Sequence, residues 1–157
     1  MKTNKVKGFT LVELIVVIAI IGVLAAILVP SMLGYVKKSK VAAANSNAKS
    51  LYNAAATALT DMDAQGLAVT AGDETYATST ATNTMAGLVH KYFNSVDTFV
   101  GTDKWAAWTI STDKSAVTAA TVCDGKYVGT NPKATVDTAA TTADYANAAA
   151  ALTYAAS

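Results

Sequence analysis

An unbroken run of apolar residues near the N-terminus dominates the hydropathy pattern of this sequence. From Phe9 to Val29 the chain has 21 residues with a single charge, at Glu13. At ~1.5 Å of rise per residue, an α-helix of that length reaches ~31 Å, which matches the hydrocarbon core of a bilayer. The pattern therefore predicts a helix that can span a membrane.

The positions after this run predict that the same helix continues beyond the membrane. Gly34 is its weak point and Gly66 is a suitable stop, while Asp61 and Asp63 are unfavourable in a last helical turn. We expect a helix that ends near residue 60, about 50 residues in all. One apolar stripe recurs at helical spacing and should lie half embedded in a small domain: Leu33, Val36, Val41, Ala44, Ala48, Leu51, Tyr52, Ala55 and Leu59.

Beyond residue 63 the pattern predicts short elements. Residues 66 to 84 are rich in Gly, Thr and Asp and indicate a surface connection, and residues 84 to 94 fit a short amphipathic helix. The last stretch, 144 to 156, is rich in alanine and predicts either a terminal helix or a poorly ordered surface tail.

Three strands are predicted between these helices. They cover residues 105 to 111, 115 to 123 and 126 to 130, and Asp124-Gly125 is a strong hairpin signal between the last two. Laid across the helix stripe as antiparallel strands, they would bury one face. Trp105 and Trp108 are then core and edge residues.

The N-terminal flank of the apolar run resembles the start of an export signal. Lys2, Lys5 and Lys7 precede Gly8, as in the basic region of a signal peptide. The apolar run is longer than in most signal peptides, and no polar small-residue cleavage region follows it. We therefore expect the signal to be retained as a membrane anchor.

Glu13 is the one charge inside the apolar run. An isolated carboxylate near the end of an apolar helix is costly to bury, so it is either hydrated among headgroups or bound to a positive partner. If the chain were cut after Gly8, Phe9 would carry a free α-amine at the same end of the helix. In a bundle of such helices, this amine could neutralise Glu13 of a neighbour and set the axial register.

About the first 40 residues resemble the type IV pilin and pseudopilin superfamily. A short basic leader ends in Gly8, Phe9-Thr10-Leu11-Val12-Glu13 follows, and the long apolar run comes next. The resemblance implies that a membrane-embedded prepilin peptidase cuts after Gly8 and methylates the new amine of Phe9. It also implies that Glu13 is needed for assembly.

Gly22 and Pro30 lie where many pilins carry a glycine and a proline, at sites of local unwinding in the filament. Proline removes a helix hydrogen bond and glycine weakens helix propensity, which agrees with that role. The resemblance implies an α+β fold with a lollipop outline, in which a long N-terminal α-helix packs against a small antiparallel β-sheet. The expected divisions are a leader (1–8), a transmembrane or filament-core half of the helix (9–30), an amphipathic half (31–62) and a globular head (63–157).

Charge limits the classes of partner. The formal net charge is +1, but without the three leader lysines 9 lysines stand against 11 acidic residues, which gives −2. Arginine is absent and no basic stripe lies away from the span, so no direct nucleic-acid site is expected. Lys37, Lys38 and Lys40 follow the apolar run and equal the leader lysines in number. The positive-inside rule, which compares the positive residues on the two sides of a membrane span, therefore gives almost no preference for either orientation. The resemblance implies a cytoplasmic N-terminus, with residues after about 30 outside.

Few residues point to chemistry. Cys123 is the single cysteine, so the disulfide of many Gram-negative pilins cannot form, and we interpret Cys123 as a small strand or turn residue. His90 is the single histidine and is expected at the solvent-exposed surface. Two acid pairs, Asp61 with Asp63 and Asp137 with Asp144, are interpreted as solvated surface acids rather than calcium ligands. We expect no catalytic residue, no metal site and no cofactor.

Three functions remain open: a structural subunit of a type IV pilus, a pseudopilin of a type II secretion system, and a membrane-anchored extracellular domain with a binding or enzymatic role. The resemblance covers the first two alike, and the Thr- and Ala-rich domain without a disulfide or a calcium cluster favours the first, a helical homopolymer. The resemblance implies a prepilin peptidase and N-methyltransferase, an assembly ATPase, a platform membrane protein and minor pilins as partners, with membrane lipid before assembly. The subunit would be a single-pass cytoplasmic (inner) membrane protein and then part of an extracellular pilus.

Overall fold

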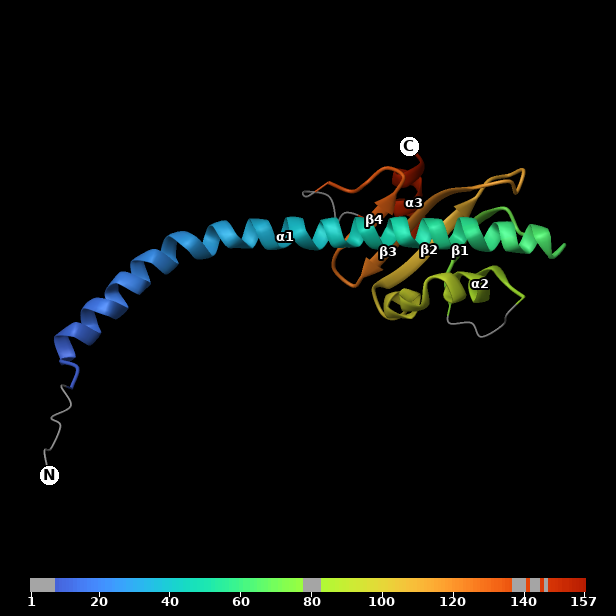
Figure 1. The fold of residues 1–157 in the computed structure, drawn as a ribbon. Helices are drawn as coiled ribbons and strands as arrows, with labels where there is room; N and C mark the ends of the chain where they lie inside the picture. The colour runs from blue at the N-terminus through green and yellow to red at the C-terminus, as the bar shows by residue number, and fades with distance from the viewer. Residues whose placement is uncertain (1–7, 78–82, 137–140, 142–144, 146) are drawn as a thin grey trace, which may run out of the picture. The chain divides into compact units, whose positions relative to one another are not determined.

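A computed structural model describes residues 8 to 77, 83 to 136, 141, 145 and 147 to 157, and the chain divides into two units, Met1–Lys37 and Lys38–Ser157. Figure 1 shows the elements in chain order. They are the helix α1 (Leu11–Ala64), strand β1 (Gly72–Thr75), helix α2 (Met85–Tyr92), the 3-10 helix η1 (Asn94–Phe99), strands β2 (Lys104–Ile110), β3 (Val117–Asp124) and β4 (Val128–Asn131), and helix α3 (Ala148–Ala156).

The predicted long helix is confirmed, but its predicted end near residue 60 is wrong. Helix α1 runs 54 residues and stops only at Ala64. Gly66 adopts a positive φ of 66°, its N–H donates to the Asp63 carbonyl, and the Leu67 N–H donates to the Met62 carbonyl. This pair of bonds is a Schellman motif, which satisfies the last helical carbonyls and outweighs the unfavourable acids in the final turn.

The three predicted strands are confirmed as β2, β3 and β4, all antiparallel, in a sheet of order β1-β2-β3-β4. Strand β1 was not predicted: it lies within residues 66 to 84, where only a surface connection was expected. The four residues of β1 pair with β2, from Gly72 opposite Ile110 to Thr75 opposite Ala107. Cross-strand side-chain bonds reinforce the pairing, since Thr109 Oγ1 donates to Asp73 Oδ1 at 2.7 Å.

One face of the sheet packs against the second half of α1. The predicted stripe is confirmed from Val41 onwards, whereas Leu33 and Val36 are 66% and 51% exposed. Buried residues of α1, β2 and β3 share one core cluster with α2 and η1 residues. The buried α1 residues are Val41, Ala44, Ala48, Leu51, Ala54, Ala55, Ala58, Leu59 and Met62.

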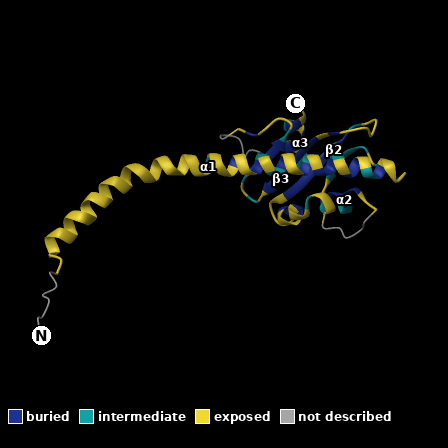
Figure 2. Ribbon diagram, in the orientation of Figure 1, coloured by how far each residue is buried: buried dark blue, intermediate teal, exposed yellow. Residues whose placement is uncertain are grey.

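The other face of the sheet is also buried, which corrects the expectation of one buried face. Ala106 and Trp108 lie in the cluster with α1, while their strand neighbours Trp105 and Ala107 lie in clusters with α3 residues. Successive strand residues point to opposite faces, so α1 and α3 cover the two sides of the sheet. Figure 2 shows that most of β2 and β3 is buried.

Helix α3 confirms the alternative of a terminal helix for the last stretch. It begins at Ala148, after an Asn147 side chain that accepts the Ala150 N–H at 3.0 Å, rather than at Asp144, which lies outside the described residues.

The predicted helix at 84 to 94 is confirmed as α2, with Thr84 as its N-cap. The 3-10 helix η1 that follows it was not predicted.

Strand β4 approaches the backbone of α1 closely at Gly129. A Cβ atom built on Gly129 would lie 2.0 Å from the carbonyl carbon and oxygen of Ala44 and 2.5 Å from the nitrogen of Asn45. No side chain fits at that distance. Glycine at this position therefore allows the sheet to pack directly onto the helix backbone.

Candidate functional site

The N-terminus of α1 is closed by a reciprocal pair of side chains, Thr10 and Glu13. The Thr10 N–H and hydroxyl donate to Glu13 Oε2 at 2.8 and 2.6 Å, and the Glu13 N–H donates to Thr10 Oγ1 at 3.3 Å. This is a capping box, which satisfies helix N–H groups that have no partner within the helix. The sequence reasoning missed the role of Thr10, although Thr-x-x-Glu before an apolar run is its signature.

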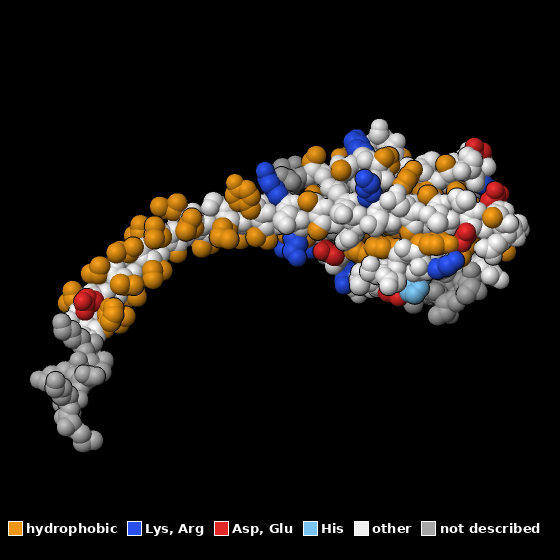
Figure 3. Space-filling model, in the orientation of Figure 1, with side chains coloured by type: hydrophobic (Ala, Val, Ile, Leu, Met, Phe, Trp, Pro, Cys, Tyr) orange, Lys and Arg blue, Asp and Glu red, His pale blue; other side chains and the backbone are white. Residues whose placement is uncertain are grey.

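The apolar residues that follow this cap have no packing partners within the described chain. Phe9 is 81% exposed, and every residue from Leu11 to Val36 is exposed. Figure 3 shows these orange side chains along the first part of α1. By length and composition α1 can cross a membrane, and none of its most apolar window is buried in the described chain. Such a surface needs lipid or other protein around it.

Gly22 and Pro30, the expected unwinding sites, both lie inside the continuous helix of this single chain. Nothing lies within 4 Å of a Cβ built on Gly22. Pro30 has no N–H, so the Ala26 carbonyl lacks its usual helical partner. The Ser31 hydroxyl donates to the Leu28 carbonyl at 2.8 Å in the same turn. The structure brings Glu13 together with Thr10, while Gly8, Gly22 and Pro30 lie apart along the chain.

His90 is partly exposed at the surface, as expected, and it also pairs with a carboxylate. Its Nε2 lies 3.0 Å from Asp97 Oδ2, and its side chain is 41% exposed. The Tyr76 hydroxyl donates to the other oxygen of Asp97 at 2.6 Å. Tyr76 above all, and then His90, hold the pKa of Asp97 below its ordinary value. The trio links α2, η1 and the segment after β1, and it includes no nucleophile of the serine or cysteine type.

The remaining candidate residues also have structural roles. Cys123 is confirmed as a buried strand residue: its thiol donates to the Asp103 carbonyl at 3.3 Å, and burial raises its pKa, which makes it unreactive. Asp61 accepts a hydrogen bond from the Tyr92 hydroxyl and lies 3.6 Å from Lys91 Nζ. Asp137 and Asp144 lie outside the described residues.

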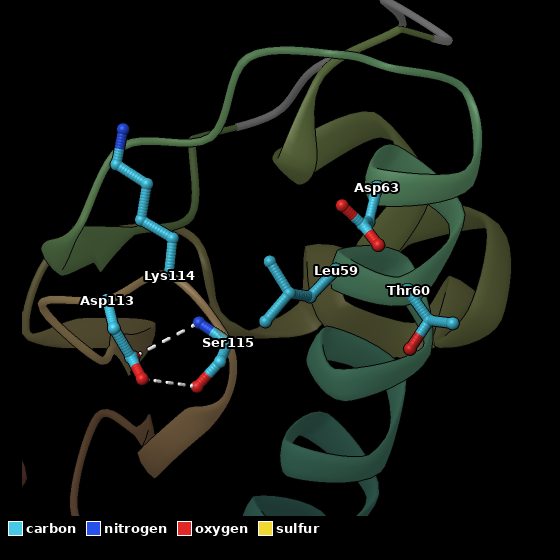
Figure 4. A pocket seen from close by; sticks show the side chains of 6 residues that line it. All are labelled: Leu59, Thr60, Asp63, Asp113, Lys114 and Ser115. Atoms are coloured by element: carbon cyan, nitrogen blue, oxygen red, sulfur yellow. Dashed lines mark hydrogen bonds between the residues drawn. The ribbon is translucent and has the colours of Figure 1, made fainter.

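A shallow pocket at the end of α1 offers no reactive group. Figure 4 shows Asp63, Thr60 and Leu59 of α1 on one side and the turn between β2 and β3 on the other. The Asp113 carboxylate of that turn accepts bonds from Ser111 and from Ser115, so it is already satisfied. Among the described residues, no group of three or more His, Cys, Asp and Glu side chains could hold a metal ion.

The capped apolar helix matches a known family model. Residues 3–29 match the family model described as the prokaryotic N-terminal methylation motif. The type IV major pilin protein PilA of Myxococcus xanthus strain DK1622 is 50% identical over 48 residues, which are 31% of this chain and 22% of PilA. A fimbrial protein of Pseudomonas aeruginosa is 47% identical over 53 residues, 34% of each chain. These similarities support a place for the chain in the type IV pilin superfamily.

A longer match extends beyond the N-terminal helix of this chain. The type IV major fimbrial protein FimA of Dichelobacter nodosus is 35% identical over 99 residues, 55% of this chain and 62% of FimA. Two other relatives are matched over only 22% and 34% of their length. No solved structure matches the chain. The α+β fold with its long N-terminal helix agrees with the superfamily, which is structural rather than enzymatic.

Proposed function

We propose that this chain is the structural subunit of a type IV pilus and polymerises through its N-terminal helix. The observation that carries the proposal is the apolar segment from Leu11 to Val36, in which every residue is exposed, headed by the Phe9 and Glu13 motif. A membrane can cover this segment before assembly, and copies of the same segment can cover it afterwards through side-chain packing between helices. The names of the pilin and fimbrial relatives support the same role.

Processing would occur between Gly8 and Phe9, with methylation of the new Phe9 amine. That amine would lie one residue before the capping box, at the positive end of the helix macrodipole, where a cation is unfavourable. The Glu13 carboxylate offsets this charge. In the filament we expect Glu13 of one subunit to bind the Phe9 amine of its neighbour, which fixes the axial register because no other charge lies between residues 8 and 36.

Flexibility of the packed helix would centre on Gly22 and Pro30. The helix has a weakened backbone preference at the first and a missing hydrogen bond at the second, so the segment between them has a low cost of unwinding. We assign the four divisions accordingly: a leader (1–8), a membrane and filament-core segment (9–30), an amphipathic segment (31–62) and a head (63–157).

The partners proposed for this cycle are a prepilin peptidase that also methylates, an assembly ATPase, a platform membrane protein and minor pilins. The subunit would first be a single-pass protein of the cytoplasmic membrane and then part of a surface filament. A type II secretion pseudopilin is not favoured, since the relatives are named as pilins and fimbrial proteins.

The test is mass spectrometry of the N-terminal peptide from filaments sheared off the cell surface. The expected peptide begins at Phe9 and carries one added methyl group. A chain that is found only in membranes and still begins at Met1 would contradict the proposal and favour a membrane-anchored extracellular domain.

A further inference from the structure

The helix segment that follows the exposed apolar run carries lysines but no carboxylates. Between Glu13 and Asp61 the helix α1 contains no Asp or Glu, whereas four lysines follow Val36. Three of them fall within four residues: Lys37, Lys38 and Lys40. In Figure 3 blue lysine side chains appear where the orange apolar stretch of α1 ends. This segment therefore concentrates positive charge at the end of the apolar surface.

Lys37 and Lys40 are neighbours on the helix surface because they lie three residues apart. Within the described part of the chain, neither side chain forms an ion pair. The positions three and four residues away from them hold no acid either: Leu33, Gly34, Val36, Val41, Ala43 and Ala44. Like charges at this spacing repel each other, so an external anion would stabilise the pair.

The depth of the two lysines relative to a bilayer follows from the length of the apolar segment. Glu13 and Lys37 enclose 23 uncharged residues. As a helix these residues span ~35 Å, slightly more than the ~30 Å hydrocarbon core, so modest tilt puts Lys37 among the headgroups opposite Glu13. Tyr35 is 75% exposed and directly precedes the lysines. Tyrosine is enriched at this interfacial level.

We propose that Lys37 and Lys40 bind the phosphates of anionic phospholipid headgroups while the subunit is in the membrane. The inference rests on the membrane-embedded stage of the proposed function. Lysine stems can lie along apolar surface while their ammonium groups reach the phosphates, and anionic lipids attract lysines at this level. The headgroup depth and the adjacent tyrosine favour lipid over a carboxylate of a second copy. Release of these lipids would then be part of leaving the membrane.

Electron paramagnetic resonance of spin-labelled lipids tests the proposal on the full chain in phosphatidylcholine bilayers. The measured quantity is the relative association of labelled phosphatidylglycerol and labelled phosphatidylcholine with the protein. We expect wild type to prefer phosphatidylglycerol, and K37Q/K40Q to lower this preference at least about threefold. The matched control is K49Q/K126Q, which removes two exposed lysines elsewhere and should keep the preference. The leader lysines are the same in all three proteins.

Two results would overturn the proposal: a wild type without preference for the anionic lipid, or a K37Q/K40Q variant that keeps it. If that variant keeps the lipid preference but loses filaments in cells, a carboxylate of a neighbouring copy is the occupant instead. Helix content by circular dichroism checks that each variant folds. The lipid measurement needs membrane insertion only, so its failure is distinct from a failure of cleavage at Gly8 or of polymerisation.

Discussion

Asn45 of α1 holds Thr135 with three hydrogen bonds. The Thr135 N–H and hydroxyl donate to Asn45 Oδ1 at 3.1 and 2.8 Å, and Asn45 Nδ2 donates to the Thr135 carbonyl at 3.0 Å. Asn45 Oδ1 also accepts the Thr130 N–H at 3.1 Å. These contacts, here called the Asn45 clamp, fasten β4 and the segment after it to the helix. They hold this region without a disulfide, since Cys123 is the single cysteine of the sequence.

Replacement of Asn45 by alanine should destabilise the head strongly. The buried N–H groups of Thr130 and Thr135 would lose their acceptor, and each unsatisfied group costs about 1 to 3 kcal/mol. We expect the free energy of unfolding to fall by about 2 to 4 kcal/mol. The measurement is urea unfolding of the detergent-solubilised chain, followed by tryptophan fluorescence. Asn53→Ala is the control, because Asn53 is exposed on the same helix; equal losses in both variants would contradict the clamp.

Replacement of Gly129 by alanine should be among the most damaging changes in the head. Its Cβ would overlap the Ala44 carbonyl at 2.0 Å, and backbone on both sides must move to relieve the clash. We expect a loss of more than about 3 kcal/mol, as for severe overpacking. Thermal unfolding measured by circular dichroism gives the comparison with wild type.

Gly34→Ala serves as the matched control for Gly129. Nothing lies within 4 Å of a Cβ built on Gly34, which lies inside a helix. Alanine has the higher helix propensity, so this variant should gain up to about 1 kcal/mol. A gain at Gly34 together with a loss at Gly129 separates the steric effect from the general effect of replacing glycine.

Glu74 should make the head less stable as pH rises. Burial raises its pKa above the ordinary 4.5, and the Trp108 indole N–H, 3.1 Å away, offsets only part of this. Between the ordinary and the raised pKa the folded state holds a proton that the unfolded chain releases, so stability falls as pH rises through that interval. Glu74→Gln should therefore be more stable than wild type near neutral pH. This advantage should shrink below pH 4.5 in urea unfolding measured across pH.

The Asp113 carboxylate should have the opposite effect on the pH dependence of stability. The variant Asp113→Asn therefore controls for a general effect of acid on the head. Hydrogen bonds from Ser111 and Ser115 lower the pKa of Asp113 from 3.8 to about 2. Its contribution to stability is complete above pH 3.8 and is lost as pH falls towards 2. Wild type should exceed this variant near neutral pH, and the two should converge at low pH. Parallel curves for both variants would contradict these assignments.

Comparison of Thr10→Ala with Glu13→Ala should separate the effect of capping helix α1 from the effect of Glu13 on the axial register between subunits. Both variants lose the capping box, which costs about 1 kcal/mol of helix stability. Only Glu13→Ala also loses the carboxylate that we propose binds the Phe9 amine of the neighbouring subunit. We expect Thr10→Ala to form sheared filaments at near wild-type yield and Glu13→Ala to accumulate in the membrane with few filaments. Similar filament yields from both variants, as measured by immunoblot, would contradict the registry role.

The elements that could be predicted from the sequence are those with strong local patterns. The long helix and the hairpin at Asp124-Gly125 follow from periodicity and from a specific turn residue, whereas the helix end was predicted too early because the acids at 61 and 63 were given more weight than Gly66. Strand β1 could not be predicted this way, because Gly72 to Thr75 are polar or small and become a strand only by pairing with β2.

The burial of the sheet on both faces could have been predicted from one feature of the sequence. Trp105 to Trp108 have no polar residue between them, and strands covered on both faces lack the usual alternation. Contacts such as Asn45 with Thr135 had no such signal. They join residues 90 positions apart through side chains whose types are common at any surface. The capping box at Thr10 could have been predicted, because it is formed by a Thr-x-x-Glu pattern within four consecutive residues.

The Asn45 clamp and the lone buried Cys123 have a consequence for where the head can fold. A head held by hydrogen bonds and an apolar core, without a disulfide, needs no oxidant and no thiol exchange during its maturation. Its stability should be the same in oxidising and in reducing surroundings, and a filament built from it should withstand dithiothreitol. Folding of the subunit then depends on burial of the sheet between its two helices, not on the redox state of the compartment that receives it.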